Sequence, residues 1–263
     1  GRVQRLRPPL GREFLPPLEQ CQRAGAQAAR AMYLRFRIIA AELQTLGIDV
    51  NCAPVADIAR HGTHLFLHNR CYSDTAAKVV GLARVAANGL LDGGVVPVIK
   101  HMPGHGLGVV DSHHALPQVT ATTAVLEQED FSVFMALNDL PMAMTAHVVY
   151  AAYDTLPATI SAQMLGIMRH QIGFSGLIMT DDISMQALPG ELDTRAEAAI
   201  AAGCDVVLHC SGVLEEMIAV SDAVGRMGTV ARQRAERALA QRNVGASVDI
   251  SNLGAQLATL VGK

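Results

Sequence analysis

The stretch VVPVIKHMPGHGLGVVDSHHALP, from Val95 to Pro117, joins an apolar run to a loop that is rich in titratable groups. The run Val95–Lys100 is almost continuously apolar and follows two glycines, which is typical of a strand buried on both faces of a parallel sheet. It ends abruptly in Lys100 and His101. Because α/β enzymes build their sites at the carboxyl ends of such strands, this segment indicates both a fold class and the position of a site.

Four other runs have the same short, apolar character and also end in polar residues. Helical patterns separate the runs, so the chain predicts repeated right-handed βα units and a parallel sheet. The further strand candidates are Gly47–Ile58, Pro141–Val149, Gly176–Asp182 and Cys204–Cys210. The expected helices are Pro17–Leu46, Thr75–Leu91, Thr123–Asn138, Ser161–Gln171, Met185–Ala202 and Leu214–Arg242. The polar residues at strand ends include Asp57, His147, Asp181, Asp182 and His209.

The number of strands decides between architectures. All five strand candidates offer polar groups and no Gly-x-Gly-x-x-Gly turn follows the first, which favours a barrel over a doubly wound sheet. A TIM (β/α)8 barrel needs eight strands. We therefore expect an α/β TIM barrel that lacks its first three strands in this chain, with residues 1–263 forming a single catalytic barrel domain. The same count predicts roughly 55 to 70 further N-terminal residues in the intact polypeptide, and a smaller open sheet is the alternative.

The composition limits the kind of partner. Hydrophobic residues make up 50% of the chain and charged residues 17%, so it can bury a large core. A net charge of -3 and the absence of Trp argue against a nucleic-acid surface. The five cysteines form no C-x-x-C pair, no signal-peptide pattern is visible, and the apolar runs fall short of the roughly 20 residues that a bilayer needs. We expect a cytoplasmic enzyme that binds a small molecule, with no nucleic-acid or membrane partner. The sequence does not determine the oligomeric state, and a monomer is favoured.

The first chemistry-bearing segment is the loop that follows the opening strand. Lys100 and His101 can donate hydrogen bonds to the hydroxyls of a polar ligand. Residues 103–108 contain one proline and three glycines, and we expect them to form a mobile, sterically open loop. Asp111 and His113 stand two residues apart, so in extended chain they share one side and form a general acid/base pair. The alternative is that these histidines are ordinary residues of a polar loop and have no catalytic role.

The second segment is GFSGLIMTDDISM, from Gly173 to Met185. Its buried strand ends in two adjacent carboxylates, which is costly unless they are used or paired. One of Asp181 and Asp182 can act as a nucleophile while its neighbour supports it or caps the next helix. The pattern does not say which, and a pure capping pair is the alternative.

The third segment is RHGTHLFLHNRCYSD, from Arg60 to Asp74. It delivers Arg70 to the same face of the sheet, where a guanidinium can bind ligand hydroxyls or carbonyls. The many histidines here and near His105 raise the alternative of a zinc site, but their spacing fits no standard motif. We therefore expect neither a metal nor another cofactor.

These motifs together resemble a known family. VIKHMPGHG, the following DSH and GFSGLIMTDDISM, with GRVQRLR near the start, are similar to the β-N-acetylglucosaminidases of glycoside hydrolase family 3, strongly over Gly1 to Cys210. The resemblance implies a TIM barrel and a retaining double displacement that releases terminal β-linked N-acetylglucosamine. It also implies a bacterial, cytoplasmic role in peptidoglycan recycling, on fragments such as GlcNAc-1,6-anhydro-MurNAc and its peptides.

The resemblance also assigns roles. It implies that Asp181 is the nucleophile and that His113, assisted by Asp111, is the general acid/base. It implies sugar binding by Arg5, Arg70, Lys100 and His101. In the family an Asp-Gln-Glu-Gly run precedes the GRVQR motif at which this chain begins, which agrees with the strand count. The competing hypotheses are a metal-dependent barrel hydrolase and a non-catalytic sugar-binding fragment.

Overall fold

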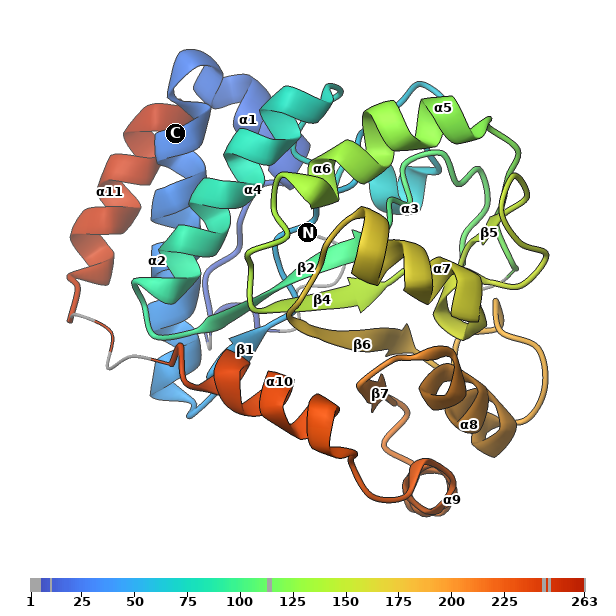
Figure 1. Ribbon diagram of the computed structural model, residues 1–263. Coiled ribbons are helices and arrows are strands. Elements are labelled where there is room, and N and C mark those ends of the chain that lie inside the picture. The colour runs from blue at the N-terminus through green and yellow to red at the C-terminus, as the bar shows by residue number, and fades with distance from the viewer. Residues whose placement is uncertain (1–5, 10, 113–114, 243–244, 246, 263) are drawn as a thin grey trace.

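The sheet is parallel throughout and follows the order of the chain (Figure 1). The computed structural model describes residues 6–9, 11–112, 115–242, 245 and 247–262. The strands, in sheet order, are β1 (Val50–Asn51), β2 (Val96–Met102), β4 (Met142–Thr145), β6 (Leu177–Asp182) and β7 (Val206–Leu208). Four of them lie within predicted strand runs, and β2 extends two residues beyond the predicted run Val95–Lys100. Each strand pairs in parallel with its neighbours, so the predicted α/β class with a parallel sheet is confirmed. In this part of the chain β1 and β7 are the outer strands.

Helices connect consecutive strands and cover the sheet (Figure 1). They are α1 (Pro17–Ala24), α2 (Ala28–Thr45), α3 (Leu65–His68), α4 (Ala76–Leu91), α5 (Thr123–Leu126), α6 (Ser132–Met135), α7 (Ala162–Gly166), α8 (Leu192–Ala202), α9 (Leu214–Val224), α10 (Thr229–Leu239) and α11 (Ile250–Val261). A wider turn over Glu127–Phe131 joins α5 to α6. The final helix, α11, packs against α2 and was not among the predicted helices. None of the described helices is both long enough and apolar enough to cross a bilayer.

Two predicted helices are each divided in the structure. The pattern over Pro17–Leu46 breaks at Gly25, and the pattern over Leu214–Arg242 breaks at Gly225. Their φ angles are 52° and 62°, which only glycine adopts without strain, so the helical hydrogen bonds stop there. The single long helices were therefore wrong, although their positions in the chain were right.

The predicted helix Met185–Ala202 starts too early. It begins at Leu192 because Pro189 has no N–H to donate and Gly190 has φ 85°. The residues between β6 and Leu192 instead form turns that hold the carboxylate of Asp182, described below.

Alternate side chains of the strands enter two separate cores. Val98, Met142 and Leu177 stand beside one another in the strand register and belong to one cluster, which α10 covers with Ala235 and Ala238. The neighbouring positions, such as Ile99, face the larger core beneath the helices. Because both faces are buried, the strands read as continuous apolar runs rather than alternating ones.

A buried ion cluster closes the amino end of the sheet. Asp205, which directly precedes β7, accepts hydrogen bonds from Arg169 at 2.6 Å and from Arg234 at 2.7 Å. The same carboxylate accepts the backbone N–H of Ile178 at 2.9 Å. It therefore ties α10 and the residues after α7 to the beginning of two strands.

Candidate active site

Polar side chains from four consecutive strand ends meet at the carboxyl edge of the sheet. Lys100 and His101 lie on β2, and Asp181 and Asp182 end β6. Asp57 lies beyond β1, and His147 follows β4. Of these, Asp57, His101 and His147 are at most 3% exposed. Tertiary packing thus collects titratable side chains from Asp57 to Asp182, more than a hundred residues apart in the sequence, as expected for sites of parallel sheets.

The two adjacent carboxylates of β6 have different surroundings. Both oxygens of Asp182 are engaged, because Oδ1 accepts the N–H of Ser184 at 3.0 Å and of Cys210 at 3.2 Å, while Oδ2 accepts the Ser184 hydroxyl at 2.6 Å. Asp181 receives one hydrogen bond from the backbone N–H of Asp182 at 2.8 Å, through its Oδ1. Its Oδ2 lies 3.8 Å from Nε2 of His101. The local turn therefore occupies Asp182 and leaves an oxygen of Asp181 facing the site.

The electrostatics keep Asp181 ionised. Burial by itself raises the pKa of this carboxyl, but His101, His147 and Lys100, together with the Asp182 N–H, outweigh burial and hold the pKa at about 2. A carboxylate with this pKa is unprotonated at any physiological pH. Such a group is able to attack an electrophilic carbon or to stabilise a developing positive charge.

His101 is held by a carboxylate on its other side. Its Nδ1 lies 2.7 Å from Oδ2 of Asp57, whose side chain is completely buried. Oδ1 of Asp57 accepts the backbone N–H of His101 at 3.2 Å and of His105 at 2.7 Å. Burial raises the pKa of Asp57, yet the two histidines and these hydrogen bonds lower it below its usual value. The imidazole of His101 is thus placed between two carboxylates.

His147 closes the other side of Asp181. Its Nδ1 lies 2.7 Å from the hydroxyl of Thr159, and its Nε2 lies 3.0 Å from the carbonyl oxygen of Asp182. Burial lowers the pKa of this imidazole. Contacts on both ring nitrogens fix the ring against the end of β6.

Arg70 and Lys100 line one cavity of about 460 Å³ next to β1. Both side chains are largely buried, at 6% and 9% exposure. Burial, followed by the charge of Arg70, lowers the pKa of Lys100. Two cations at this edge, beside Asp181 and His101, suit a ligand that presents several hydroxyl or carbonyl oxygens.

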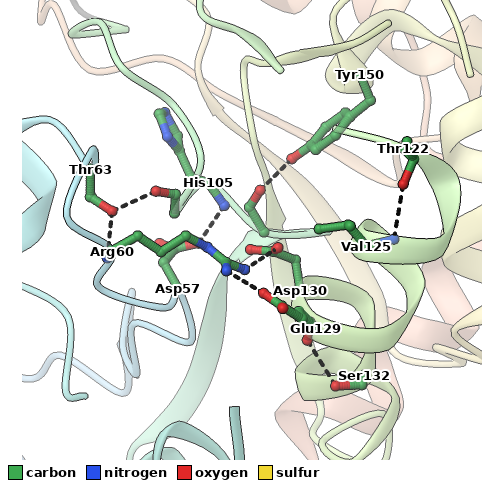
Figure 2. A network of polar contacts seen from close by, with 12 residues as sticks. Asp57, Arg60, Thr63, His105, Thr122, Val125, Glu129, Asp130, Ser132 and Tyr150 are labelled. Atoms are coloured by element: carbon green, nitrogen blue, oxygen red, sulfur yellow. Dashed lines mark hydrogen bonds and ion pairs between the residues drawn. The ribbon is translucent and has the colours of Figure 1, made fainter. Parts of the chain in front are cut away.

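The first half of the loop that follows β2 is closely packed rather than sterically open as predicted (Figure 2). Residues 103–106 are buried, and the Tyr150 hydroxyl donates to the carbonyl oxygen of Gly104 at 2.6 Å. The Thr63 hydroxyl donates to the carbonyl oxygen of Gly106 at 2.5 Å. A Cβ on Gly106 would lie 2.2 Å from the carbonyl oxygen of Ile58. The glycines therefore allow other segments to approach the backbone closely. The prediction of a sterically open loop was wrong for this half.

A cluster of charged side chains packs against residues 103–106. Arg60 contacts the carboxylates of Glu129 and Asp130, the latter at 2.6 Å, and Asp130 packs against Gly104 (Figure 2). Burial raises the pKa of Asp130 to about 6 although Arg60 opposes the shift. The far end of the loop is fixed too, by a two-stranded parallel pairing of β3 (Gln118–Val119) with β5 (Val149–Tyr150).

Three predicted site residues remain, and two of them fall outside the described part of the chain. Arg5 and His113 fall outside the described residues. Asp111 is half-buried, and its carbonyl oxygen accepts the N–H of Ala115 at 3.0 Å. The structure thus brings together Arg70, Lys100, His101 and Asp181, and leaves the acid/base pair of Asp111 and His113 as a prediction. Within the described ranges no three His, Cys, Asp or Glu side chains are grouped as metal ligands.

Sequence reasoning noted Asp57 and His147 only as polar strand ends and gave them no role. The signal was present, because each directly follows an apolar run that ends at the site edge. Their partners were not visible, since the contacts of Asp57 with His101 span 44 residues and those of His147 with Asp182 span 35.

The comparisons agree with this geometry. The sequence profile of the glycosyl hydrolase family 3 N terminal domain matches residues 2–244. The chain is 39% identical over 218 residues to a beta-hexosaminidase of Alkalilimnicola ehrlichii, covering 80% of this chain and 62% of that protein. It is 40% identical over 220 residues to a beta-hexosaminidase of Chromobacterium violaceum, covering 80% and 61%. The chain thus spans about three fifths of the length of these curated relatives.

Solved structures are similar over almost the whole chain. NagZ from Neisseria gonorrhoeae, in complex with N-trifluoroacetyl-D-glucosamine, matches 100% of this chain and 80% of its own at a TM-score of 0.85 and 30% identity. A glycoside hydrolase family 3 beta-N-acetylglucosaminidase from Paenibacillus sp. str. FPU-7 matches 95% of this chain and 53% of its own, with a TM-score of 0.82 and 29% identity.

Proposed function

The chain belongs to glycoside hydrolase family 3, and on that premise we propose that it is a β-N-acetylhexosaminidase that releases terminal β-linked N-acetylglucosamine. The observation that carries the proposal is the ionised Asp181, with one oxygen facing His101 and a pKa held at about 2 by His101, His147, Lys100 and the backbone N–H of Asp182. The beta-hexosaminidase names of the curated relatives and the glucosamine derivative bound to the Neisseria protein support the same substrate class.

Asp181 is the nucleophile in this proposal. Its carboxylate oxygen attacks the anomeric carbon as the glycosidic C–O bond breaks, through an oxocarbenium-like transition state, and a glycosyl ester forms. Water then attacks the same carbon, the ester bond breaks, and the carboxylate is regenerated with net retention of configuration. Asp182 does not compete for this role, because its oxygens already accept hydrogen bonds from Ser184 and Cys210.

His113 supplies and recovers the proton, with Asp111 as its partner. His113 protonates the departing glycosidic oxygen in the first step and removes a proton from the attacking water in the second. The two residues follow the half of the loop that is anchored by Thr63 and Tyr150. This arrangement differs from the pair of carboxylic acids that most glycosidases use.

The sugar is bound by cations and by the ordered imidazole. Arg70, Lys100 and His101 offer hydrogen bonds to its hydroxyl and carbonyl oxygens, and Arg5 completes the set. We further propose that the described sheet is part of a TIM barrel and that peptidoglycan fragments such as GlcNAc-1,6-anhydro-MurNAc peptides are the substrates. The cytoplasmic location and the monomeric state likewise stay predictions.

Hydrolysis of an aryl β-N-acetylglucosaminide tests the function directly. We expect activity that survives a chelator, with the β-anomer of N-acetylglucosamine as the first product by NMR. Asp181→Asn should abolish the activity, and Asp182→Asn should fold less stably because the turn loses its charged acceptor. Release of the α-anomer first, or a fully active Asp181→Asn variant, would contradict the double displacement. Activity lost with the chelator would favour the metal-dependent alternative.

A further inference from the structure

The carboxylate of Asp57 is fully buried and all of its contacts serve two neighbouring histidines. Its Oδ1 accepts the backbone N–H of His101 at 3.2 Å and of His105 at 2.7 Å, and its Oδ2 faces Nδ1 of His101 at 2.7 Å. No solvent reaches the side chain, since its exposure is 0%. One carboxylate therefore fixes the side chain of His101 and the start of the following loop together. Figure 2 shows its contact with the backbone of His105.

These contacts decide where the proton of His101 lies. An ionised carboxylate only accepts hydrogen bonds, so Nδ1 of His101 must carry a hydrogen in order to bond Asp57. The second ring nitrogen, Nε2, then points toward Oδ2 of Asp181 at 3.8 Å. In the neutral ring this Nε2 has a free lone pair, and it does not bind the oxygen of Asp181 that must attack.

We propose that Asp57 is a positioning residue of the glycosidase, which holds His101 in the Nδ1–H tautomer so that Nε2 accepts a sugar hydroxyl and leaves Asp181 free to attack. The proposal rests on the function proposed above. It assigns Asp57 no contact with substrate, because the carboxylate is buried beneath His101 and the backbone of His105.

Asp57→Asn separates the positioning role from the structural one. The amide oxygen can still accept the two backbone N–H groups, and these donors would repel the amide NH2 from that side. The NH2 must then face Nδ1 of His101, which becomes an acceptor, and the ring proton moves to Nε2. There it can hydrogen-bond the carboxylate of Asp181 and hinder its attack.

The direct measurement is the proton position in a ¹⁵N-histidine NMR spectrum of the whole chain. A His101→Gln sample identifies the ring signals of His101 among the ten histidines. We expect a hydrogen on Nδ1 in the wild type at neutral pH, and on Nε2 alone in Asp57→Asn. An unprotonated Nδ1 in the wild type overturns the inference, and this result does not depend on Asp57→Asn being able to fold.

Activity supplies the second readout, with a matched control. We expect Asp57→Asn to lower kcat/KM for the aryl glycoside about 10- to 100-fold, the usual range for residues that orient a functional imidazole from behind. Asp205→Asn replaces another buried carboxylate, at the opposite end of the sheet, and should change neither the His101 signals nor kcat/KM per folded molecule.

The outcomes separate the two proposals. A moved proton with unchanged kcat/KM, or an unmoved proton in Asp57→Asn, overturns the positioning role while the glycosidase function stands. A wild type that hydrolyses no β-N-acetylglucosaminide overturns the proposed function, and the NMR spectrum still reports whether Asp57 sets the tautomer of His101.

Discussion

The two ends of the parallel sheet each bury a carboxylate that receives several hydrogen bonds, but they use different partners. At the amino end, Asp205 is held by Arg169 and Arg234, whose guanidinium groups remain charged at any physiological pH. At the carboxyl end, Asp181 and Asp57 face histidines and a lysine. Unlike arginine, histidine and lysine can lose a proton at accessible pH, and they can also donate a hydrogen bond to a ligand.

This contrast shows how one sheet separates stability from chemistry. Arginine fixes a charge and a geometry, which suits an end that only has to stay closed. Histidine and lysine keep a carboxylate ionised while remaining adjustable, which suits an end where charge develops during a reaction. Substitutions at the two ends should therefore affect different measurements.

The largest effect is expected for Asp181→Asn at the carboxyl end. Loss of the nucleophile should reduce kcat on the order of 10³-fold or more, as removal of nucleophiles does in other covalent mechanisms. The free energy of unfolding should fall by only about 2 kcal/mol, since the ionised group with a pKa of about 2 is stabilised by nearby cations. Aryl glycoside kinetics and urea unfolding of the same sample measure both. If the loss of kcat were explained entirely by unfolded protein in the sample, the proposed division between a reactive end and a stabilising end of the sheet would be contradicted.

Asp205→Asn at the amino end should show the opposite pattern. Two partly buried arginines would face a neutral group, which costs about 3 kcal/mol or more when a buried ion pair is broken from one side. Urea unfolding should report this loss, while kcat/KM of the folded fraction stays unchanged. A clear fall in kcat/KM would show that the two ends are coupled.

Asp130 tests whether an arginine partner is enough to stabilise a buried carboxylate. Its pKa is raised to about 6, above the usual 3.8, so the folded state holds a proton that the unfolded state releases. Stability from this group is complete below about pH 4 and is lost as the pH rises through 6, by up to about 3 kcal/mol. Urea unfolding at several pH values should show this decline.

Two variants identify the group responsible for that decline. Asp130→Asn should remove it, because no proton is then released on unfolding. Asp139→Asn should leave it in place, since Asp139 pairs with Arg84 at the surface with a side chain that is 64% exposed. If stability still declines with rising pH in Asp130→Asn, other titratable groups cause the decline and Asp130 does not.

The smallest effect is expected for Tyr150→Phe, which removes the hydroxyl that donates to Gly104. The buried carbonyl oxygen loses this donor, so the free energy of unfolding should fall by about 1 to 2 kcal/mol. Tyr153→Phe is the control, because its hydroxyl bonds the more exposed Glu127 and should matter less. If Tyr150→Phe also lowers kcat/KM in folded protein, the anchored half of the loop positions the acid/base segment as well.

Local sequence patterns predicted the sheet well and the helix boundaries less well. Each of the five strands overlaps a predicted run, because burial on both faces forces continuous apolar residues, and only β2 extends beyond its run, to Met102. The helices were drawn too long at Gly25, Gly225 and Pro189, where backbone conformation outweighs the amphipathic pattern.

The glycines of the loop after β2 show the same limit from the other side. Glycine permits either mobility or close packing, and the sequence alone could not distinguish them. The contacts of Gly104 and Gly106 with Tyr150, Thr63 and Ile58 come from segments on either side of the loop, so packing decided the outcome.

By itself the sequence determined the parallel α/β fold, the family, and the residue types gathered at the strand ends, because these follow from local hydrophobicity and from contiguous motifs. The family resemblance pointed to Asp181, but only the tertiary structure showed that Asp182 is engaged in the turn and that Asp57 lies behind His101. Those differences depend on hydrogen bonds and charges that reach a carboxylate from distant segments, and no local pattern specifies such contacts.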